Sequence, residues 1–253
     1  LRGHRPEGEV LVLGAVAVAF APIFPKMAMQ SSEIGTIATA FWRLTLAFPI
    51  LLAVRFFVRD ARSNRQASES RLRPRPALPW LMLPGLLFGL DLLTWHLSFP
   101  LTTAANATLL ANLEVVIVGL VGWLILKERL RWPFPVGGML ALGGVAWLLW
   151  SGPATIEGRS PLVGDLLAVF TAVWYASYLL SIKRLRRSVA TLTVIVWVSG
   201  VGAIVLFLAA VLRGESLVPD TGEAWLYLVL LALVPHCLGQ GLIILSLAAL
   251  PAS

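Results

Sequence analysis

Charged residues are scarce in this chain of 253 residues, and their scarcity excludes an ordinary soluble domain. Asp, Glu, Lys and Arg together make up 13% of the sequence, against about 25% in soluble proteins. Hydrophobic residues make up 58%, and the mean hydropathy is +0.85. This composition indicates an integral membrane protein.

Signatures of several enzyme classes are also absent. The single cysteine, Cys237, excludes an internal disulfide and a zinc site built from cysteines. The three histidines form no H-E-x-x-H arrangement, and the sequence has no G-x-x-x-x-G-K-[ST] loop for nucleotide phosphates. We therefore expect no metal, no cofactor and no direct use of ATP, and the sequence does not indicate an enzyme.

Long apolar runs dominate what is present. A helix needs about 20 mostly apolar residues to cross a hydrocarbon core about 30 Å thick, and eight runs approach that length. None alternates with a period of two, so the predicted fold class is an all-α, multi-span helical bundle in the membrane. The runs cover roughly residues 9–29, 33–57, 78–99, 102–126, 133–151, 162–182, 189–212 and 224–248.

Basic residues cluster in three loops between these runs. Seven arginines lie between Arg55 and Arg75, and the segments KERLRW (from Lys127) and IKRLRRS (from Ile182) are also basic. Because cytoplasmic loops of membrane proteins collect Lys and Arg, these loops and the N-terminus are predicted on the cytoplasmic side. We expect a multi-pass protein of the inner or plasma membrane, with the lipid bilayer as its main partner and no nucleic acid bound.

Two halves of the chain resemble each other weakly. GEVLVLGAVAVAF, from Gly8, resembles GDLLAVFTAVWYA, from Gly164, and HLSFPLTTAA, from His96, aligns with ILSLAALPAS, from Ile244. The loop after the first run has one basic residue and its counterpart KRLRRS has four, so the two face opposite sides of the membrane. We predict inverted repeats, residues 1–156 and 157–253, with ten helices expected and the second repeat about two helices short.

The sequence resembles a known family at this point. ATAFWRLTLAFPILLAV, which contains Arg43, looks like the second helix of EamA-type transporters in the drug/metabolite transporter superfamily. The segment from Leu101 to Leu149 resembles their fourth and fifth helices, although Val115 stands where the family usually has proline after Glu114. The resemblance implies ten helices in two inverted five-helix repeats, cytoplasmic termini, and movement of small metabolites, often outward. Bacterial members similar to this chain carry amino acids and related metabolites.

Arg43 is the most informative single residue. It lies ten residues after Glu33, which puts it about 15 Å into the membrane at about 1.5 Å per residue. A charge near the midplane costs at least about 2.5–3.5 kcal/mol, so a partner inside the bundle is expected. We predict Glu114 as that partner from its depth, with Asp91 second. Three roles stay open: an ionic staple between helices, contact with an anionic group of a solute, and a part in gating.

Other polar and aromatic side chains recur at helical spacing and predict a cavity between the helices. Asp91 and Trp95, Trp174 and Tyr178, and His236 and Gln240 each stand four residues apart, on one helical face. Such faces, if they converge, form an apolar pocket with a few polar groups. His96 is interpreted as a surface histidine. The candidate cavity residues are Trp42, Arg43, Asp91, Trp95, Asn106, Glu114, Trp174, Tyr175, Tyr178, His236 and Gln240.

These features together predict a transporter of small metabolites. We expect export of amino acids by alternating access around a midplane cavity, with protons as a possible coupling ion carried by Glu114, Asp91 or His236. The alternative solutes are drugs or nucleotide-sugar and nucleoside-type compounds, although a nucleotide-sugar path should show more cations in the bundle than Arg43. The oligomeric state is not predicted.

Overall fold

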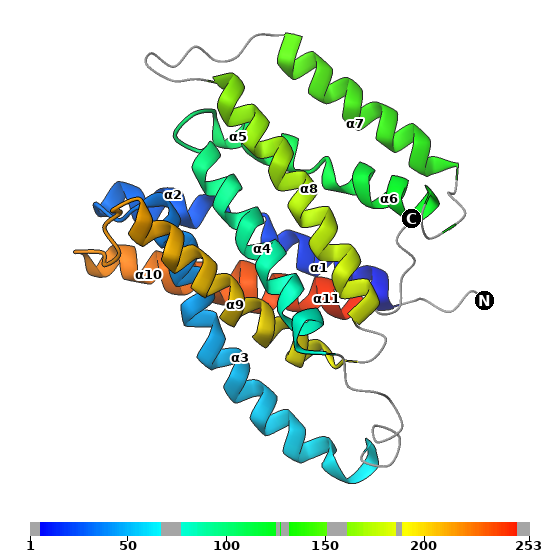
Figure 1. The fold of residues 1–253 in the computed structure, drawn as a ribbon, viewed down its shortest axis with the longest axis vertical. Coiled ribbons are helices and arrows are strands. Elements are labelled where there is room, and N and C mark those ends of the chain that lie inside the picture. Colours follow the sequence, from blue (N-terminus) through cyan, green and yellow to red (C-terminus); the bar gives the residue numbers. More distant parts are fainter. Residues whose placement is uncertain are drawn as a thin grey trace.

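The computed structural model describes residues 6–66, 77–124, 127, 132–150, 161–185 and 189–246, and Figure 1 shows that these residues form helices. Parts of the basic loops, such as 67–76 and 186–188, and the C-terminal residues 247–253 lie outside this description. The helices are α1 (Pro6–Val18), α2 (Ile23–Ser31), α3 (Thr36–Gln66), α4 (Leu78–Ser98), α5 (Ala104–Ala111), α6 (Glu114–Leu124), α7 (Pro133–Trp150), α8 (Pro161–Leu185), α9 (Thr191–Leu212), α10 (Gly222–Leu231), the π-helix η2 (Ala232–Gln240) and α11 (Gly241–Ser246).

Seven helical segments within the described residues are long and apolar enough to cross a membrane, which confirms the prediction of an all-α, multi-span membrane protein. The eighth predicted run, 133–151, forms α7, whose apolar stretch Phe134–Trp147 is shorter than the other seven. The seven segments are Glu9–Ser31, Thr36–Phe57, Leu78–Ser98, Ala105–Leu124, Pro161–Leu185, Thr191–Leu212 and Gly222–Leu245.

Three of the seven segments are interrupted near their middle. The first breaks at residues 19–22 before α2, where Pro22 lacks the amide hydrogen that a continuous helix needs. The fourth breaks between α5 and α6 without any proline, through tight turns in which Leu113 N donates to Leu110 O (3.1 Å). The last passes into the π-helix η2, which contains Pro235. Pro49 and Pro84, in contrast, lie inside continuous helices.

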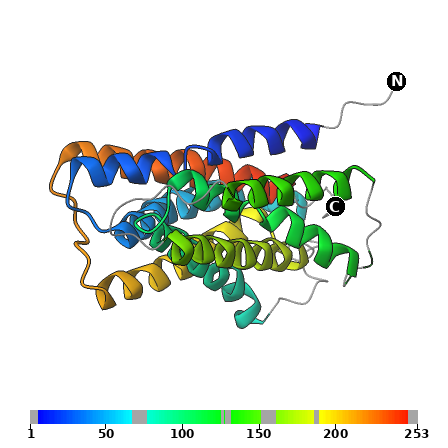
Figure 2. The same cartoon turned by 90° about the horizontal axis from the view of Figure 1, so that it is seen from above.

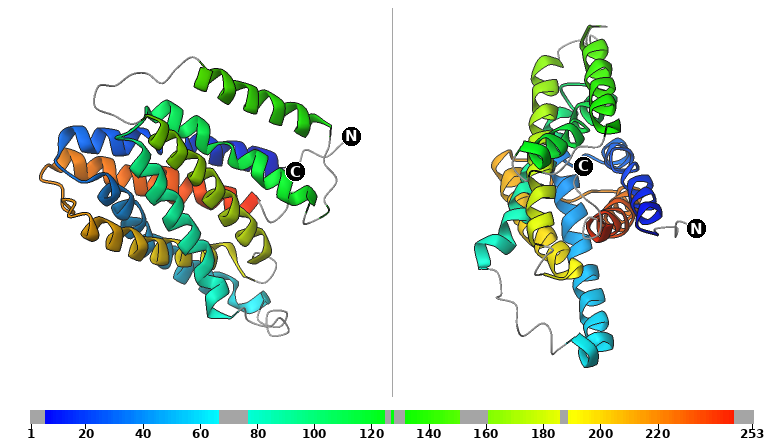
Figure 3. Two further views of the ribbon diagram at one scale, coloured as in Figure 1. Left: turned by 45° about the horizontal axis from the view of Figure 1, so that its top comes forward. Right: turned by 90° about the vertical axis from the view of Figure 1, so that its right-hand side faces the viewer.

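Helices from the two halves of the sequence pack against each other. The main contacts join α4 to α8 and α9, α3 to α9, α2 to α10, and α1 to η2 and α11. Figure 2 shows α1, α2, α10 and α11 together on one side of the bundle and α8 and α9 on the other. Both views of Figure 3 place α7 at the edge, beside α6.

Glycines let α4 and α9 approach closely. A Cβ added to Gly85 would lie 2.6 Å from Val201 Cβ and 2.9 Å from Trp197 O, and one on Gly89 would lie 3.2 Å from Gly202 Cα. Small residues that allow backbones to approach are a common basis of helix association in membranes. The α4–α9 contact therefore depends on the lack of side chains at these glycines.

The α9–α10 loop holds the N-terminal end of α3. The Glu215 carboxylate accepts hydrogen bonds from Ile37 N (2.8 Å) and Ala38 N (3.0 Å), two first-turn amides that have no partner within the helix. Next to this contact, the Ser32 hydroxyl donates to the Asp220 carboxylate and lowers the pKa of that carboxyl. These bonds fix the start of the helix that carries Arg43.

Replacing Gly85 with alanine tests the close α4–α9 contact. We expect Gly85→Ala to destabilise the protein by about 1–3 kcal/mol, as overpacking of a close contact does. The matched control is Gly143→Ala in α7, where nothing lies within 4 Å of an added Cβ, and it should leave stability unchanged or slightly raised. Thermal unfolding in detergent, followed by size-exclusion chromatography, measures both. Equal midpoints for the two variants would show that the contact is not close.

Candidate functional site

A cavity of about 420 Å³ lies at the centre of the bundle. Its volume falls within the range of about 300–1,000 Å³ that is typical of small-molecule sites. Residues of α1, α3, α4, α5, α6, α8, η2 and α11 line it, together with residues at the breaks before α2 and before α6. Its polar and aromatic lining residues are Arg43, Phe88, Asp91, Trp95, Thr108, Asn112, Glu114, Thr171, Tyr175 and Gln240.

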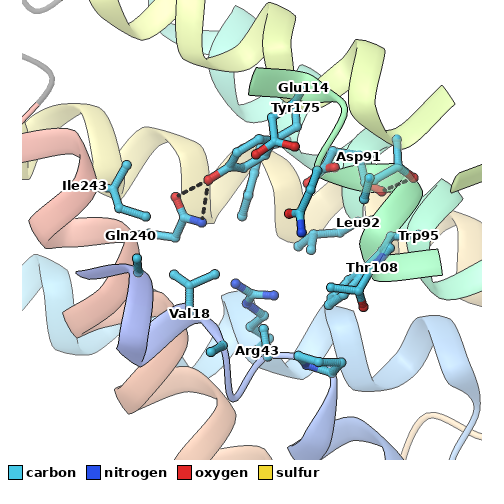
Figure 4. Close-up of a pocket in the computed structure, with 18 residues that line it drawn as sticks. Val18, Arg43, Asp91, Leu92, Trp95, Thr108, Glu114, Tyr175, Gln240 and Ile243 are labelled. Carbon is cyan, nitrogen blue, oxygen red and sulfur yellow. Dashed lines mark hydrogen bonds between the residues drawn. The ribbon is translucent and has the colours of Figure 1, made fainter. Parts of the chain in front are cut away.

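Arg43 reaches this cavity from α3. Its side chain is 2% exposed, and Ala40 and Ala47, about one turn away on either side, leave room for it. The guanidinium Cζ lies 5.8 Å from the centre of the Phe88 ring, and Nε has no hydrogen-bond partner among the residues that the structure describes. Figure 4 shows the guanidinium pointing into the cavity.

The expected ion pair between Arg43 and Glu114 or Asp91 is absent from the described part of the chain, where no carboxylate lies within 4.0 Å of the guanidinium. The physical reason is the cavity itself. Asp91 on α4 and Glu114 on α6 line its opposite wall, as Figure 4 shows, so the three charges face one enclosed space without touching. The staple role predicted for Arg43 is therefore not what this geometry provides.

The interruption between α5 and α6 positions Glu114. Because α6 begins at Glu114, its carboxylate lies beside the first-turn amides, which carry partial positive charge and favour an anion. Asp91 sits in the middle of α4, one turn before Trp95. Near Asp91, the hydroxyls of Thr94 and Thr171 are 2.7 Å apart and join α4 to α8.

A second polar group lines the cavity from the other half of the sequence. The Gln240 amide donates from Nε2 to the Tyr175 hydroxyl (3.1 Å), and its Oε1 accepts from the Tyr178 hydroxyl (3.4 Å). Tyr178 lies behind the cavity wall, fully buried, with its ring 4.8 Å from that of Phe88. Gln240 is thus held in one orientation by two tyrosines.

His236 lies near this group but does not line the cavity. The Ser199 hydroxyl donates to Ile195 O (2.8 Å), so its oxygen accepts from the His236 Nε2–H (2.8 Å). Nδ1 then carries the lone pair, and it has no partner within the described residues. The ring is 5.7 Å from that of Phe88.

Six of the eleven candidate residues line the cavity: Arg43, Asp91, Trp95, Glu114, Tyr175 and Gln240. The other candidates lie elsewhere. Trp42 donates from Nε1 to Leu217 O (2.6 Å) and packs on Trp225, with ring centres 4.8 Å apart. Asn106 follows the cap of α5, where its backbone amide donates to Thr103 Oγ1 (3.1 Å). Trp174 is half-buried on α8, and Tyr178 and His236 stand behind the wall.

Sequence reasoning missed four polar or aromatic lining residues: Phe88, Thr108, Asn112 and Thr171. Phe88 and Thr171 stand one turn before the candidates Asp91 and Tyr175, so the helical spacing contained a signal for both. Asn112 could not be found in this way, because the break after α5 changes which side chains share a face. The interpretation of His96 as a surface histidine is wrong. Its side chain is fully buried, and its Nδ1 lies 2.8 Å from Leu92 O.

A groove of about 680 Å³ adjoins the cavity. It runs between α2 and α5 at the end of the bundle that the charge pattern predicts to be outside. Pro22, Thr108 and Asn112 line both spaces, so the groove and the cavity are contiguous. Lys26, an exposed residue of α2, stands in the groove. This geometry gives the cavity a route toward one membrane surface.

Comparisons with known proteins agree with this architecture. The model of the EamA-like transporter family matches residues 8–150 and 162–253. An uncharacterized transporter of Archaeoglobus fulgidus is 27% identical over 231 residues, which is 88% of this chain and 75% of that protein. One of Methanothermobacter thermautotrophicus is 28% identical over 162 residues, 64% of this chain and 47% of that protein. A solved crystal structure superposes with a TM-score of 0.64 at 23% identity, over 95% of this chain and 78% of the other, which shows a shared fold.

The water route through the groove can be tested with thiol chemistry. In a Cys237→Ala background, we expect Asn112→Cys to react with a charged, membrane-impermeant methanethiosulfonate, because thiolates form only where water reaches. Leu208→Cys is the matched control, since Leu208 is 54% exposed on α9 but faces neither the groove nor the cavity. Mass spectrometry of protein in liposomes measures the labelling. Equal labelling of both cysteines, or of neither, would contradict a water-filled route.

Proposed function

The chain belongs to the EamA-like transporter family, and from this membership and the charges in its cavity we propose that it exports amino acids or similar zwitterions. One observation carries the proposal: an arginine that has no carboxylate partner among the described residues and two carboxylates face the same central space. A zwitterion supplies the complementary charges, with its carboxylate at Arg43 and its ammonium group at Asp91 or Glu114. A guanidinium binds a carboxylate through two parallel hydrogen bonds, which fixes the orientation of the solute.

Energetics favour this assignment over a purely structural role. A buried charge without a partner is costly in low dielectric, and the charged head of a bound solute removes that cost. The solute is neutral overall, so binding adds no net charge to the membrane interior. Without a solute, water that enters through the contiguous groove can hydrate these charges.

Organic cations are the second candidate. The two carboxylates outnumber the one guanidinium among the described lining residues, and this excess of negative charge favours a cationic drug. The same excess disfavours nucleotide sugars, because a diphosphate would lie beside Asp91 and Glu114 with Arg43 as its one cationic ligand in the described lining.

We infer alternating access from the two halves of the chain, residues 1–156 and 157–253. The alignment of Gly8 with Gly164 pairs Ala15 with Thr171 and Ala19 with Tyr175, and all four aligned lining residues face the cavity. The alignment of His96 with Ile244 pairs Leu92 with Gln240 and Trp95 with Ile243, and these four residues also line the cavity. Equivalent positions thus meet at one central space, which supports inverted repeats around a midplane site. The charge pattern supports an inside N-terminus, and we propose the inner or plasma membrane as the location.

We also infer a role for protons. With one guanidinium and two carboxylates, the empty cavity carries one negative charge too many for neutrality, and a proton on Asp91 or Glu114 removes it. A solute ammonium group then takes the place of that proton. Because the solute also brings its carboxylate, the occupied cavity without the proton carries one net negative charge, so this exchange couples the solute to the movement of one proton. Intramembrane carboxylates act in this way in many proton relays.

Arg43→Gln tests the site and the solute class. In proteoliposomes, we expect this variant to transport amino acids at least about tenfold more slowly, since a hydrogen bond to a charged group is worth about 1.5–3 kcal/mol. The matched control is Arg55→Gln on the same helix, because Arg55 bonds Thr193 outside the cavity and should be dispensable. Uptake of a labelled amino acid is competed with its N-acetyl and methyl-ester derivatives. Full-rate transport by folded Arg43→Gln would contradict the site, and exclusive transport of cationic esters would favour the second candidate.

A pH gradient tests proton coupling. We expect an imposed gradient to change the flux through the native protein, and Asp91→Asn or Glu114→Gln to abolish that dependence while exchange of solute for solute continues. Thr108→Val, at a lining residue that carries no charge, serves as the control and should keep the gradient dependence. A flux that ignores the gradient in the native protein would show that the carboxylates bind the solute without moving a proton.

A further inference from the structure

We propose that Gln240 selects the side chain of the transported solute and favours a side chain that carries a hydrogen-bond acceptor. This inference rests on the proposed transport of zwitterions and extends it from the head of the solute to its side chain. Gln240 lines the cavity, is 2% exposed, and is the last residue of the π-helix η2.

The lining chemistry is divided between the two halves of the sequence. The charged residues Arg43, Asp91 and Glu114 all precede residue 150, whereas the described lining residues after residue 161 are Thr171, Tyr175, Gln240 and Ile243, which are uncharged. Figure 4 shows Gln240 and Ile243 on one side of the space, Asp91 and Trp95 on the other, and the Arg43 guanidinium between them. A zwitterion held at Arg43 and Asp91 therefore directs its side chain toward Gln240.

The hydrogen-bond pattern decides which side chain fits. Tyr178 donates to the Gln240 Oε1, and one Nε2 hydrogen goes to the Tyr175 hydroxyl. The second Nε2 hydrogen has no partner in the described part of the chain. The Tyr175 hydrogen reaches Oε1 only at a long 3.5 Å, so it can turn to a ligand. Two donors are thus left for the solute, and both match a hydroxyl, carbonyl or amide oxygen.

The surroundings make these donors selective. Val18 and Ile243 flank Gln240 on the cavity wall, so an apolar side chain there would bury the free donors without a partner. A site that is built to hydrogen-bond a ligand rejects the analogue that lacks the group, because the polar atoms of the site are then unpaired. Tyr178 acts as a positioning residue: it does not line the cavity, yet it fixes the amide that does.

The experiment measures inhibition constants in proteoliposomes for two pairs of solutes with similar shapes, threonine against valine and asparagine against leucine. We expect the native protein to bind threonine about tenfold more tightly than valine, and asparagine about tenfold more tightly than leucine. This preference is smaller than the largest selectivity of sites that hydrogen-bond their ligand. Gln240→Met keeps the length of the side chain and removes the amide, and it should bring both ratios close to one by weakening threonine and asparagine. Tyr178→Phe should lower the ratios in the same direction by a smaller factor.

Leu238→Met is the matched control, because Leu238 belongs to the same π-helix, is 53% exposed and does not line the cavity, and its ratios should equal those of the native protein. All variants are compared at equal amounts of monodisperse protein. Unchanged ratios in Gln240→Met, or equal weakening of all four solutes, would overturn the assignment of Gln240 while leaving the zwitterion site intact. A native protein that carries no amino acid would overturn the proposed function, and this inference with it.

Discussion

The buried guanidinium of Arg43 is the constraint on which the rest of the structure depends. A charge at this depth is tolerated only beside a partner or water, and no carboxylate of the described residues provides the partner. The bundle therefore has to keep an open space at its centre, and the carboxylates of Asp91 and Glu114 face Arg43 across that space. Closing the cavity onto an ion pair would be the more stable arrangement for a static protein. The absence of this ion pair among the described residues is consistent with the proposed solute site.

The three interrupted helices make this open space chemically useful. The breaks before α2 and α6 and the π-helix η2 all lie at the cavity, and they contribute Pro22, Asn112, Glu114 and Gln240 to its lining. Backbone that departs from the α-helix inside a membrane is stable only where protein or water satisfies its polar groups. A π-helix also spaces its side chains differently from an α-helix, which brings Gln240 to the two tyrosines that orient it. The irregular segments and the cavity therefore require each other.

Much of this fold could be predicted from hydropathy, because lipid imposes length and apolarity on each span, and each of the eight predicted runs corresponds to helices in the described residues. The limits have physical causes. Hydropathy depends on the side chains and not on the backbone geometry. An apolar run therefore shows neither where its helix is interrupted nor that the apolar stretch of α7 is short. Depth along the span predicted Arg43, Asp91 and Glu114 near one another, and all three line the cavity, but depth cannot distinguish contact from separation across a cavity. Depth also does not tell which way a side chain points around the helix axis. Trp42 and Asn106 were therefore predicted in the cavity, although packing directs them elsewhere.

Aligned positions of the two halves carry side chains that make different contacts. Extending the alignment that pairs Gly8 with Gly164 brings Arg43 opposite Ser199, and the alignment of His96 with Ile244 brings Phe88 opposite His236. In the first half this pair is a guanidinium 5.8 Å from a ring centre, open to the cavity; in the second it is a hydroxyl bonded to an imidazole, sealed in the core. If the two halves are the repeats that we propose, aligned positions carry charge in one and form a neutral, closed contact in the other. The charged lining residues all belong to the first half, so under the proposed alternating access we expect a solute to keep one orientation, with its side chain toward the uncharged residues of the second half.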